Sequence, residues 1–406
     1  MIEGPPVLRV LIAGGGTGGH IIPALAIADA LRAGPGSTEI LFLGTPRGLE
    51  SRLVPQAGYP LELIEVGQLK NVALATRLRT LFDLPRALLR ARALLQSFRP
   101  QVVVGVGGYA SGPAMAAALL GGVPTLAFEP NAAPGLANRL VGKRVSAAAV
   151  NFAPAARFFR HAEVTGIPVR AEFFRIAPSA AAAPPHLLVF GGSQGARLLN
   201  QAMPQVVARL LDQVPGLTVL HQAGARHVET TLAAYQASGA DASRWSVHAF
   251  LDDMAQRFAA ATLVLARSGA STVAELCAAG KPALLVPFAL AADDHQRRNA
   301  KVLVEQGAAA LLLEPELNEA SLLAALLALL QEPGRLAAMG ARARSLAHPD
   351  AAERIAGMVR RLASRGGTEG SLRGRGRREA RRGFLLDKPR GGTRGAPQSK
   401  ANRFAL

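Results

Sequence analysis

The amino-acid sequence predicts an α/β protein with two doubly wound, Rossmann-like parallel-sheet domains. Short apolar runs alternate with stretches of helical periodicity along the chain. The alternation starts twice with an apolar run that leads into a glycine-rich turn, at residues 14–19 and at residues 191–195. Runs that are apolar throughout are typical of parallel strands buried on both faces. Two successive series of this kind indicate two sheets, each covered by helices.

The expected elements follow in chain order. In the first series we expect strands at 7–13, 40–43, 102–106 and 125–128, and helices at 22–32 and 72–99. In the second series we expect strands at 187–190, 217–220, 247–250, 263–266 and 283–286, and a long helix at 196–211.

The domain boundary is expected between residues 165 and 185, because residues 178–185 are rich in alanine and proline. The predicted division is a first domain at 1–164, a second at 165–345 and a helix at 346–364 that returns to the first domain. Residues 365–406 are rich in glycine and arginine and predict a disordered tail.

Composition narrows the class of protein. Half of the 406 residues are hydrophobic, as in globular proteins, and no run of eighteen apolar residues predicts a transmembrane helix. The N-terminus lacks the features of a signal peptide, and the single Cys277 cannot form an internal disulfide, which favours a cytoplasmic location. The net charge is +18, of which residues 365–406 supply +9 with 12 Lys/Arg and 3 Asp/Glu. This balance favours anionic partners.

The first glycine loop predicts a phosphate site. Gly14 to Gly19 follow a strand and precede a helix, whose free N–H groups and dipole favour anions. The spacing also fits a dinucleotide fingerprint, but the acidic residue expected at the end of the second strand is replaced by the sequence 44–47, Gly-Thr-Pro-Arg. His20 stands at the helix start, where a neutral imidazole can accept a proton; a capping or packing histidine is the alternative.

The second series also contains a helix start that follows a strand and is suited to phosphate. Ser271 and Thr272 lie at a helix start that follows a strand, with Glu275 one turn in. Backbone amides there can hold a diphosphate while Glu275 accepts two ribose hydroxyls; helix capping is the structural alternative. The chain contains no Asp-x-Asp pair and no Cys/His cluster, so we expect no metal and charge stabilisation by amides.

Residues 72–99 combine a helical pattern with arginines. The stretch contains six arginines, at positions 77, 79, 86, 90, 92 and 99, but only one acidic residue, Asp83. The stretch predicts either a helix that lies on an anionic membrane or an ordinary helix with a solvated arginine face.

Read together, these loops resemble the MurG family, the N-acetylglucosaminyltransferases of bacterial peptidoglycan synthesis. The resemblance rests on the motifs at 14–20, 107–113, 129–131, 191–197, 267–275 and 293–296 and covers residues 7–363. It implies a GT-B fold, in which the two domains face a central cleft. It also implies an inverting transfer of N-acetylglucosamine from UDP-N-acetylglucosamine to the C4 hydroxyl of the muramyl sugar of lipid I, forming lipid II without a cofactor. The implied location is peripheral, on an anionic surface at the cytoplasmic face of the inner membrane, with other cell-wall synthesis and division proteins as partners.

The resemblance also implies roles for individual residues. His20 is the favoured catalytic base, with Glu129 as the second candidate. The expected substrate-binding residues are Thr17, Gly18, Gly19, Asn131, Arg170, Ser193, Leu251, Ala270, Ser271, Thr272, Val273, Ala274, Glu275 and Gln296. The chain departs from the family where Phe128 and Pro130 replace a common His and Gln.

Two alternatives remain open at this stage. Another GT-B enzyme that uses a UDP-sugar, such as a glycolipid synthase or an epimerase, would share the loops. A nucleic-acid-binding protein acting through the basic tail is the alternative from a different class, although we expect no nucleic-acid partner.

Overall fold

The computed structural model describes residues 7–66, 74–177 and 184–365, with the side chains of 74–82 left aside. The described residues from Val7 to Ala363 belong to one unit. Residues 178–183 of the predicted linker and 366–406 of the predicted tail lie outside the described residues.

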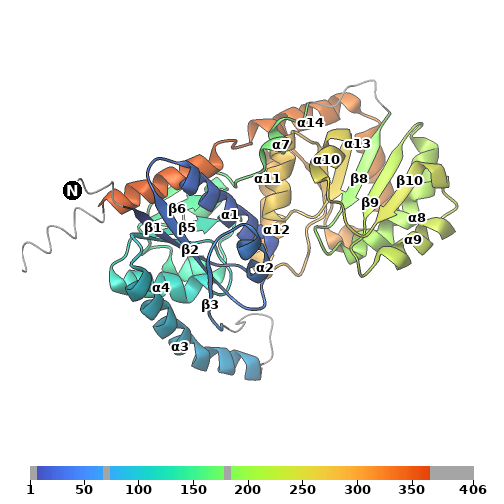
Figure 1. Cartoon of the computed structure of the whole chain (residues 1–406). Helices are drawn as coiled ribbons and strands as arrows, with labels where there is room; N and C mark the ends of the chain where they lie inside the picture. Colours follow the sequence, from blue (N-terminus) through green and yellow to red (C-terminus); the bar gives the residue numbers. More distant parts are fainter. Residues whose placement is uncertain (1–6, 67–73, 178–183, 366–406) are drawn as a thin grey trace, which may run out of the picture. The chain divides into compact units, whose positions relative to one another are not determined.

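The first half of the described chain forms a parallel sheet of seven strands in the order β3-β2-β1-β4-β5-β6-β7 (Figure 1). Its strands are β1 (Leu8–Ala13), β2 (Thr38–Gly44), β3 (Leu61–Leu63), β4 (Val102–Gly105), β5 (Thr125–Glu129), β6 (Ala147–Val150) and β7 (Ala162–Val164). The helices are α1 (Gly18–Ala33), α2 (Glu50–Gln56), α3 (Leu74–Phe98), α4 (Ser111–Gly121), α5 (Leu136–Val141) and α6 (Ala153–Ala156). Helix α7 (Ala171–Phe174) follows β7 in the chain, but its Phe173 is buried in the same cluster as Leu188 and Phe190 of the second half.

The strands are apolar because both faces of the sheet are buried. In β1, Val10 and Ile12 belong to one hydrophobic cluster, whereas Leu11 and Ala13 belong to another. Side chains alternate between the two faces of a strand, so a strand buried on both faces shows a continuous apolar run. This is the pattern from which the strand was predicted.

The second half forms a parallel sheet of six strands in the described chain, in the order β10-β9-β8-β11-β12-β13. Its strands are β8 (His186–Phe190), β9 (Thr218–Gln222), β10 (Trp245–His248), β11 (Leu263–Ala266), β12 (Ala283–Leu285) and β13 (Ala310–Leu311). The main helices are α8 (Arg197–Gln213), α9 (Val228–Ala237), α10 (Met254–Ala260), α11 (Ala270–Ala279), α12 (His295–Glu305), α13 (Glu319–Leu330) and α14 (Pro333–Ser345). The 3-10 turns are Ala242–Arg244, Ala292–Asp294 and Glu314–Glu316. The predicted α/β class with two doubly wound parallel sheets is confirmed.

Some strands differ from the prediction. Strands β3, β6, β7 and β13 were not predicted, and β10 begins two residues before the expected run. Strand β6 reads Ala-Ala-Ala-Val, a composition of low strand propensity, and it pairs along its length with Leu126–Glu129 of β5. Its strand conformation therefore comes from pairing and burial in the sheet.

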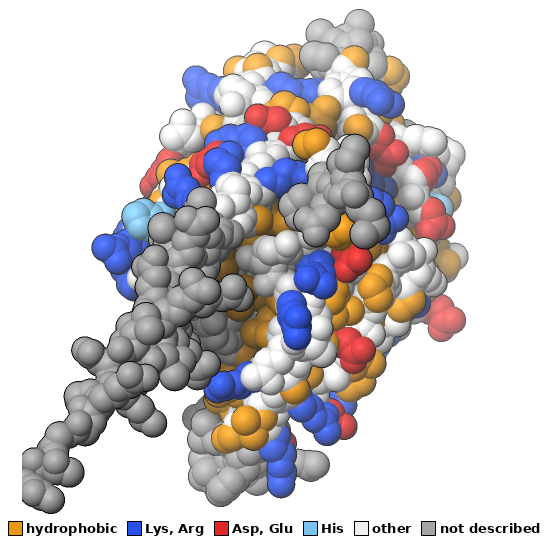
Figure 2. Space-filling model, turned by 60° about the vertical axis from the view of Figure 1, so that its left-hand side comes forward, with side chains coloured by type: hydrophobic (Ala, Val, Ile, Leu, Met, Phe, Trp, Pro, Cys, Tyr) orange, Lys and Arg blue, Asp and Glu red, His pale blue; other side chains and the backbone are white. Residues whose placement is uncertain are grey.

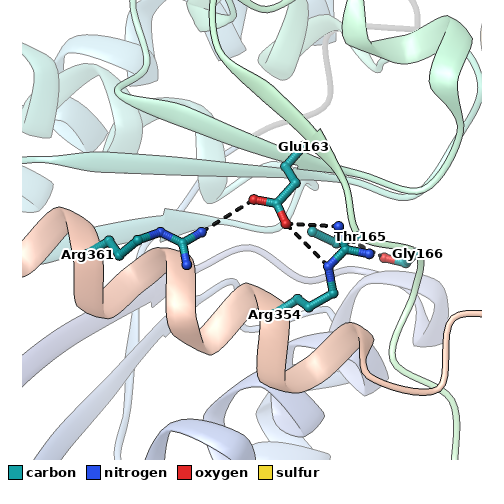
Figure 3. A network of polar contacts seen from close by, with 5 residues as sticks. All are labelled: Glu163, Thr165, Gly166, Arg354 and Arg361. Atoms are coloured by element: carbon teal, nitrogen blue, oxygen red, sulfur yellow. Dashed lines mark hydrogen bonds and ion pairs between the residues drawn. The ribbon is translucent and has the colours of Figure 1, made fainter.

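A helix at residues 351–365 packs on the first sheet, although it follows the second in the sequence. Ile355, Met358 and Val359 are buried in the same cluster as Val10 and Ile12 of β1. Figure 3 shows Glu163 of β7 between two arginines of this helix. Its Oε1 is 2.9 Å from Nη2 of Arg354, and its Oε2 is 3.3 Å from Nη2 of Arg361. The helix is thus part of the core of the first sheet.

The strand order fixes where ligands can bind. The order reverses direction between β1 and β4 in the first sheet and between β8 and β11 in the second. In open parallel sheets, ligands bind at such switch points, beyond the carboxyl ends of the strands. The loops that follow these four strands are the glycine-rich segments 14–17, 106–110, 191–196 and 267–269.

Candidate functional site

The first glycine loop is organised by a buried carboxylate. Glu50, at the start of α2, accepts hydrogen bonds from the N–H of Gly16 (2.7 Å) and from the N–H and hydroxyl of Thr45 (both 2.9 Å). The loop continues across the switch point, where the N–H of Gly15 donates to the carbonyl of Gly107 at 3.2 Å. The loops after β1 and β4 therefore form one packed unit.

His20 lies in the first turn of α1, beside this unit. Its Nδ1 is 3.2 Å from the hydroxyl of Thr17. When Nδ1–H donates to that hydroxyl, Nε2 carries the lone pair. A Cβ added at Gly107 would lie 2.9 Å from Nε2, so the absence of a side chain at Gly107 leaves the room for the ring.

The environment of His20 keeps its ring neutral. Burial, with a smaller contribution from His295, lowers the pKa of His20 to about 4, and the charge of Glu50 acts in the opposite direction. At neutral pH the imidazole is therefore an unprotonated group that can accept a proton.

The start of α11 forms the second centre of the site. The Ser271 hydroxyl is buried and has no hydrogen-bond partner among the described residues. Glu275, one turn further, has no hydrogen bond to its carboxylate within the described chain, and burial raises its pKa to about 7, against the lowering effect of Arg170. A Cβ at Gly19 would lie 3.8 Å from the Ser271 hydroxyl, so the starts of α1 and α11 come together. Two polar side chains without partners beside a helix N-terminus are suited to an anionic, hydroxyl-bearing ligand.

A chain of hydrogen bonds connects further predicted residues. Asn299 of α12 donates to the side-chain oxygen of Asn131 and to the carbonyl of Ser268, both at 3.1 Å. The Ser268 hydroxyl donates to the carbonyl of Gln296 at 2.8 Å. The Oε1 atom of Gln296 accepts the N–H of Phe288, which leaves its amide nitrogen able to donate.

Glu129 is buried, and the hydrogen bonds of its carboxylate are made to residues that follow it in the chain. Its carboxylate accepts hydrogen bonds from the backbone and side chain of Asn131, from the N–H of Gly135 and from the Asn138 amide. Burial raises the pKa of Glu129, and these hydrogen bonds oppose the shift. The structure therefore gives Glu129 a role in shaping the loop after β5, and its catalytic role stays a prediction.

The other predicted residues lie around these centres. Ala270 of α11 is buried in the cluster that holds Val10 of β1, whereas Val273 and Leu251 are buried together in a cluster of the second half. Thr272 and Ala274 are partly exposed. Arg170 is exposed, forms an ion pair with Glu172 at 2.9 Å and acts on Glu275. Thr17 and Ser193 are exposed in their loops, and no hydrogen bond joins Ser193 to the other predicted residues within the described chain.

Sequence reasoning missed Glu50 and Asn299. We noted that no acidic residue follows the second strand directly, yet Glu50 stands six positions after Gly44 and reaches the glycine loop. Its carboxylate accepts from the loop amide, so it does not serve as the ribose ligand of a dinucleotide site. The run Gly48-Leu49-Glu50 at a helix start is the sequence pattern from which Glu50 could have been predicted. No local pattern indicates Asn299, because its partners are distant in the sequence.

Comparison with known proteins agrees with this arrangement. Residues 10–150 match the glycosyltransferase family 28 N-terminal domain, and residues 186–355 match its C-terminal domain. The chain is 42% identical over 380 residues to the UDP-N-acetylglucosamine–N-acetylmuramyl-(pentapeptide) pyrophosphoryl-undecaprenol N-acetylglucosamine transferase of Anaeromyxobacter sp. (strain K), covering 92% of this chain and 98% of that protein. It is 46% identical over 366 residues to the Nitrosococcus oceani protein of the same name, covering 88% and 99%.

The crystal structure of Acinetobacter baumannii MurG is similar to this fold, with a TM-score of 0.73 and 30% sequence identity over 87% of this chain and 99% of that one. The fold is accordingly GT-B, as the resemblance of the motifs implied. The chain is an enzyme of the glycosyltransferase class and belongs to the MurG family of N-acetylglucosamine transferases.

Proposed function

We propose that this enzyme transfers N-acetylglucosamine from UDP-N-acetylglucosamine to the C4 hydroxyl of the muramyl sugar of lipid I, forming lipid II with inversion at the anomeric carbon. The names of its relatives describe an N-acetylglucosamine transferase and print UDP-N-acetylglucosamine and N-acetylmuramyl-(pentapeptide) pyrophosphoryl-undecaprenol with it. The observation that carries the proposal is the start of α11, where the Ser271 hydroxyl and the Glu275 carboxylate are without hydrogen-bond partners among the described residues. A nucleoside diphosphate offers a phosphate oxygen that can accept the Ser271 hydroxyl and ribose hydroxyls that can donate to the Glu275 carboxylate.

The donor binds mainly to residues 165–345. The amides from Ala270 to Thr272 hold the diphosphate, and Glu275 accepts the two ribose hydroxyls. The backbone of Leu251 contacts the uracil. Gln296 donates its free amide to a hydroxyl of the donor sugar, since its oxygen already accepts the N–H of Phe288.

The remaining predicted residues complete the substrate contacts. Ser193 lies on the second glycine loop and contacts phosphate, whereas Arg170 balances the charge near Glu275. Thr17, Gly18 and Gly19 approach the acceptor diphosphate at the start of α1. Asn131 contacts the donor from a loop that Glu129 shapes through its hydrogen bonds.

The chemical step needs one base and one stabilised leaving group. The acceptor hydroxyl loses its proton to Nε2 of His20, and its oxygen attacks the anomeric carbon from the face opposite UDP. The bond from that carbon to the phosphate oxygen breaks, and its electron pair leaves with UDP, whose negative charge faces the N-terminus of α11. The proton on His20 is then released to solvent.

The enzyme acts at the cytoplasmic face of the inner membrane as a peripheral protein. No single helix of the described chain is long and apolar enough to cross a membrane; α13 and α14 meet those criteria only as a pair bent by 87°. Helix α3 exposes Leu89 (65%) and the side chain of Arg86 (81%). Figure 2 shows Lys and Arg side chains interspersed with hydrophobic side chains and with Asp and Glu side chains on the displayed face. Exposed leucine and arginine side chains on one helix, as on α3, are suited to an anionic lipid surface, and partner proteins of cell-wall synthesis would meet the enzyme there.

Transfer to a soluble lipid I analogue tests the proposal. Labelled N-acetylglucosamine from its UDP donor should appear in a β-1,4-linked product, and the rate should depend on the acceptor. Equilibrium binding of UDP-N-acetylglucosamine is measured alongside. A protein that binds the donor but transfers nothing to this acceptor would contradict the acceptor assignment, whereas release of an epimerised sugar would indicate an epimerase.

A further inference from the structure

Glu50 is a buried carboxylate whose charge is not balanced by a cation. Only 1% of the residue is exposed, and no Lys or Arg forms an ion pair with it in the described part of the chain. Its partners are the N–H of Gly16 and the N–H and hydroxyl of Thr45. A buried charge is costly even when it is hydrogen-bonded, so a role beyond stability explains its presence best.

The glycine loop is built around this carboxylate. A Cβ added at Gly15, Gly44 or Gly48 would in each case collide with the Glu50 side chain. At Gly15 the backbone also has a φ of +147°, which side-chain-bearing residues rarely adopt. The path of the loop and the position of the carboxylate therefore depend on each other.

The same loop connects Glu50 to His20. Gly15 lies against Glu50 and donates its N–H to the carbonyl of Gly107, and Gly107 in turn lies against the His20 ring. Two ionisable groups act on the ring among the described residues: His295 at the start of α12 opposes a positive charge there, and Glu50 at the start of α2 favours it. Glu50 is thus the one acidic group of the described chain that acts on the imidazole.

We propose that Glu50 is a positioning residue for the transfer: it fixes the glycine loop beside His20, and its negative charge stabilises the imidazolium that forms when His20 takes the acceptor proton. The inference rests on the proposed role of His20 as base. The carboxylate gains no proton in this step, because the proton stays on the imidazole until it is released to solvent.

Glu50→Gln tests the charge, and Thr45→Val is its matched control. The Gln variant keeps the size of the side chain but loses the charge, whereas the Val variant removes one hydrogen bond and keeps the charge. For Glu50→Gln we expect kcat to fall roughly tenfold, the KM for UDP-N-acetylglucosamine to stay within about twofold, and the acid limb of the kcat profile to move to lower pH by about one unit. For Thr45→Val we expect kcat within about threefold of the wild type and an unmoved acid limb.

A double-mutant cycle separates this role from a purely structural one. If Glu50 acts through His20, Glu50→Gln should have little further effect on kcat in a His20→Ala background. Multiplicative losses, or equal losses and unmoved acid limbs in the Gln and Val variants, would overturn the inference. If Glu50→Gln does not fold, Glu50→Asp replaces it in the cycle and tests the positioning of the loop, because it keeps the charge but the shorter side chain cannot reach both Gly16 and Thr45.

Other results would refute the proposed reaction or the role of His20 rather than the role of Glu50. A wild-type enzyme without transfer to lipid I analogues would refute the proposed reaction. A His20→Ala variant with wild-type kcat would refute the role of His20 as base. With transfer present and His20→Ala impaired, a Glu50→Gln variant that matches the wild type refutes the role of Glu50 alone.

Discussion

Replacing Gly107 by alanine should impair both folding and catalysis. Its φ of +91° is unfavourable for alanine and costs about 1–2 kcal/mol. The new Cβ would also lie 2.9 Å from Cδ2 and Nε2 of His20, whereas ordinary contacts begin near 3.4 Å. The ring or the loop must therefore move by about half an ångström. Since misplacing a catalytic group by about 1 Å costs on the order of 100-fold in rate, we expect kcat/KM to fall roughly 10- to 100-fold.

Steady-state transfer assays and thermal unfolding measure the two effects separately. The melting temperature should fall by about 2–8 °C, and the affinity for UDP-N-acetylglucosamine should be retained, because the proposed donor contacts lie mainly on the second sheet. Gly112→Ala is the matched control, since a Cβ at Gly112 meets nothing within 4 Å and the residue lies in α4. A folded Gly107→Ala enzyme with wild-type kcat, or equal defects in the two variants, would refute the reasoning.

Three further predictions concern other parts of the enzyme. His20→Ala should lower kcat by roughly 100- to 10,000-fold while donor affinity, measured by calorimetry, stays unchanged; unchanged turnover would transfer the role of base to another group. The pKa of Glu275 is raised to about 7, so its carboxylate ionises between pH 6 and 8. Because ribose hydroxyls favour the ionised form, UDP affinity should rise with pH over that range, and Glu275→Gln should weaken binding about 10- to 100-fold and flatten the pH dependence. Replacing Arg86 and Arg90 by glutamine should weaken binding to anionic vesicles about 30-fold relative to neutral ones, since each basic group near the surface contributes about 1 kcal/mol; equal binding would make α3 an ordinary surface helix.

The sequence predicted the strands that are buried on both faces and missed those held by pairing. Strand β11 was predicted with its observed bounds, because Leu263–Ala266 is an apolar run with polar residues on both sides. Strand β6 escaped, since three alanines carry no strand signal of their own. The residue composition of a segment predicts whether it is buried, but it does not predict which strand the segment pairs with.

The residues of the candidate site also fall into those that the sequence predicted and those that it did not. The glycine loops, Ser271 and Glu275 were predictable, because each belongs to a local pattern at the carboxyl end of a strand. Glu50 binds a residue 34 positions away, and Asn299 binds one 168 positions away. Contacts of that range are products of the assembled fold, and one sequence without homologues carries no direct signal for them.

The helix at residues 351–365 has a consequence for how the protein is made. Its side chains Ile355, Met358 and Val359 complete a cluster that includes Val10 and Ile12, which are synthesised more than 340 residues earlier. During translation the first sheet emerges with this apolar surface uncovered, and the gap closes only after the second sheet has left the ribosome. A nascent chain stalled before residue 351 should therefore expose the surface to chaperones and proteases, and a stop codon there would damage the end of the molecule that was made first.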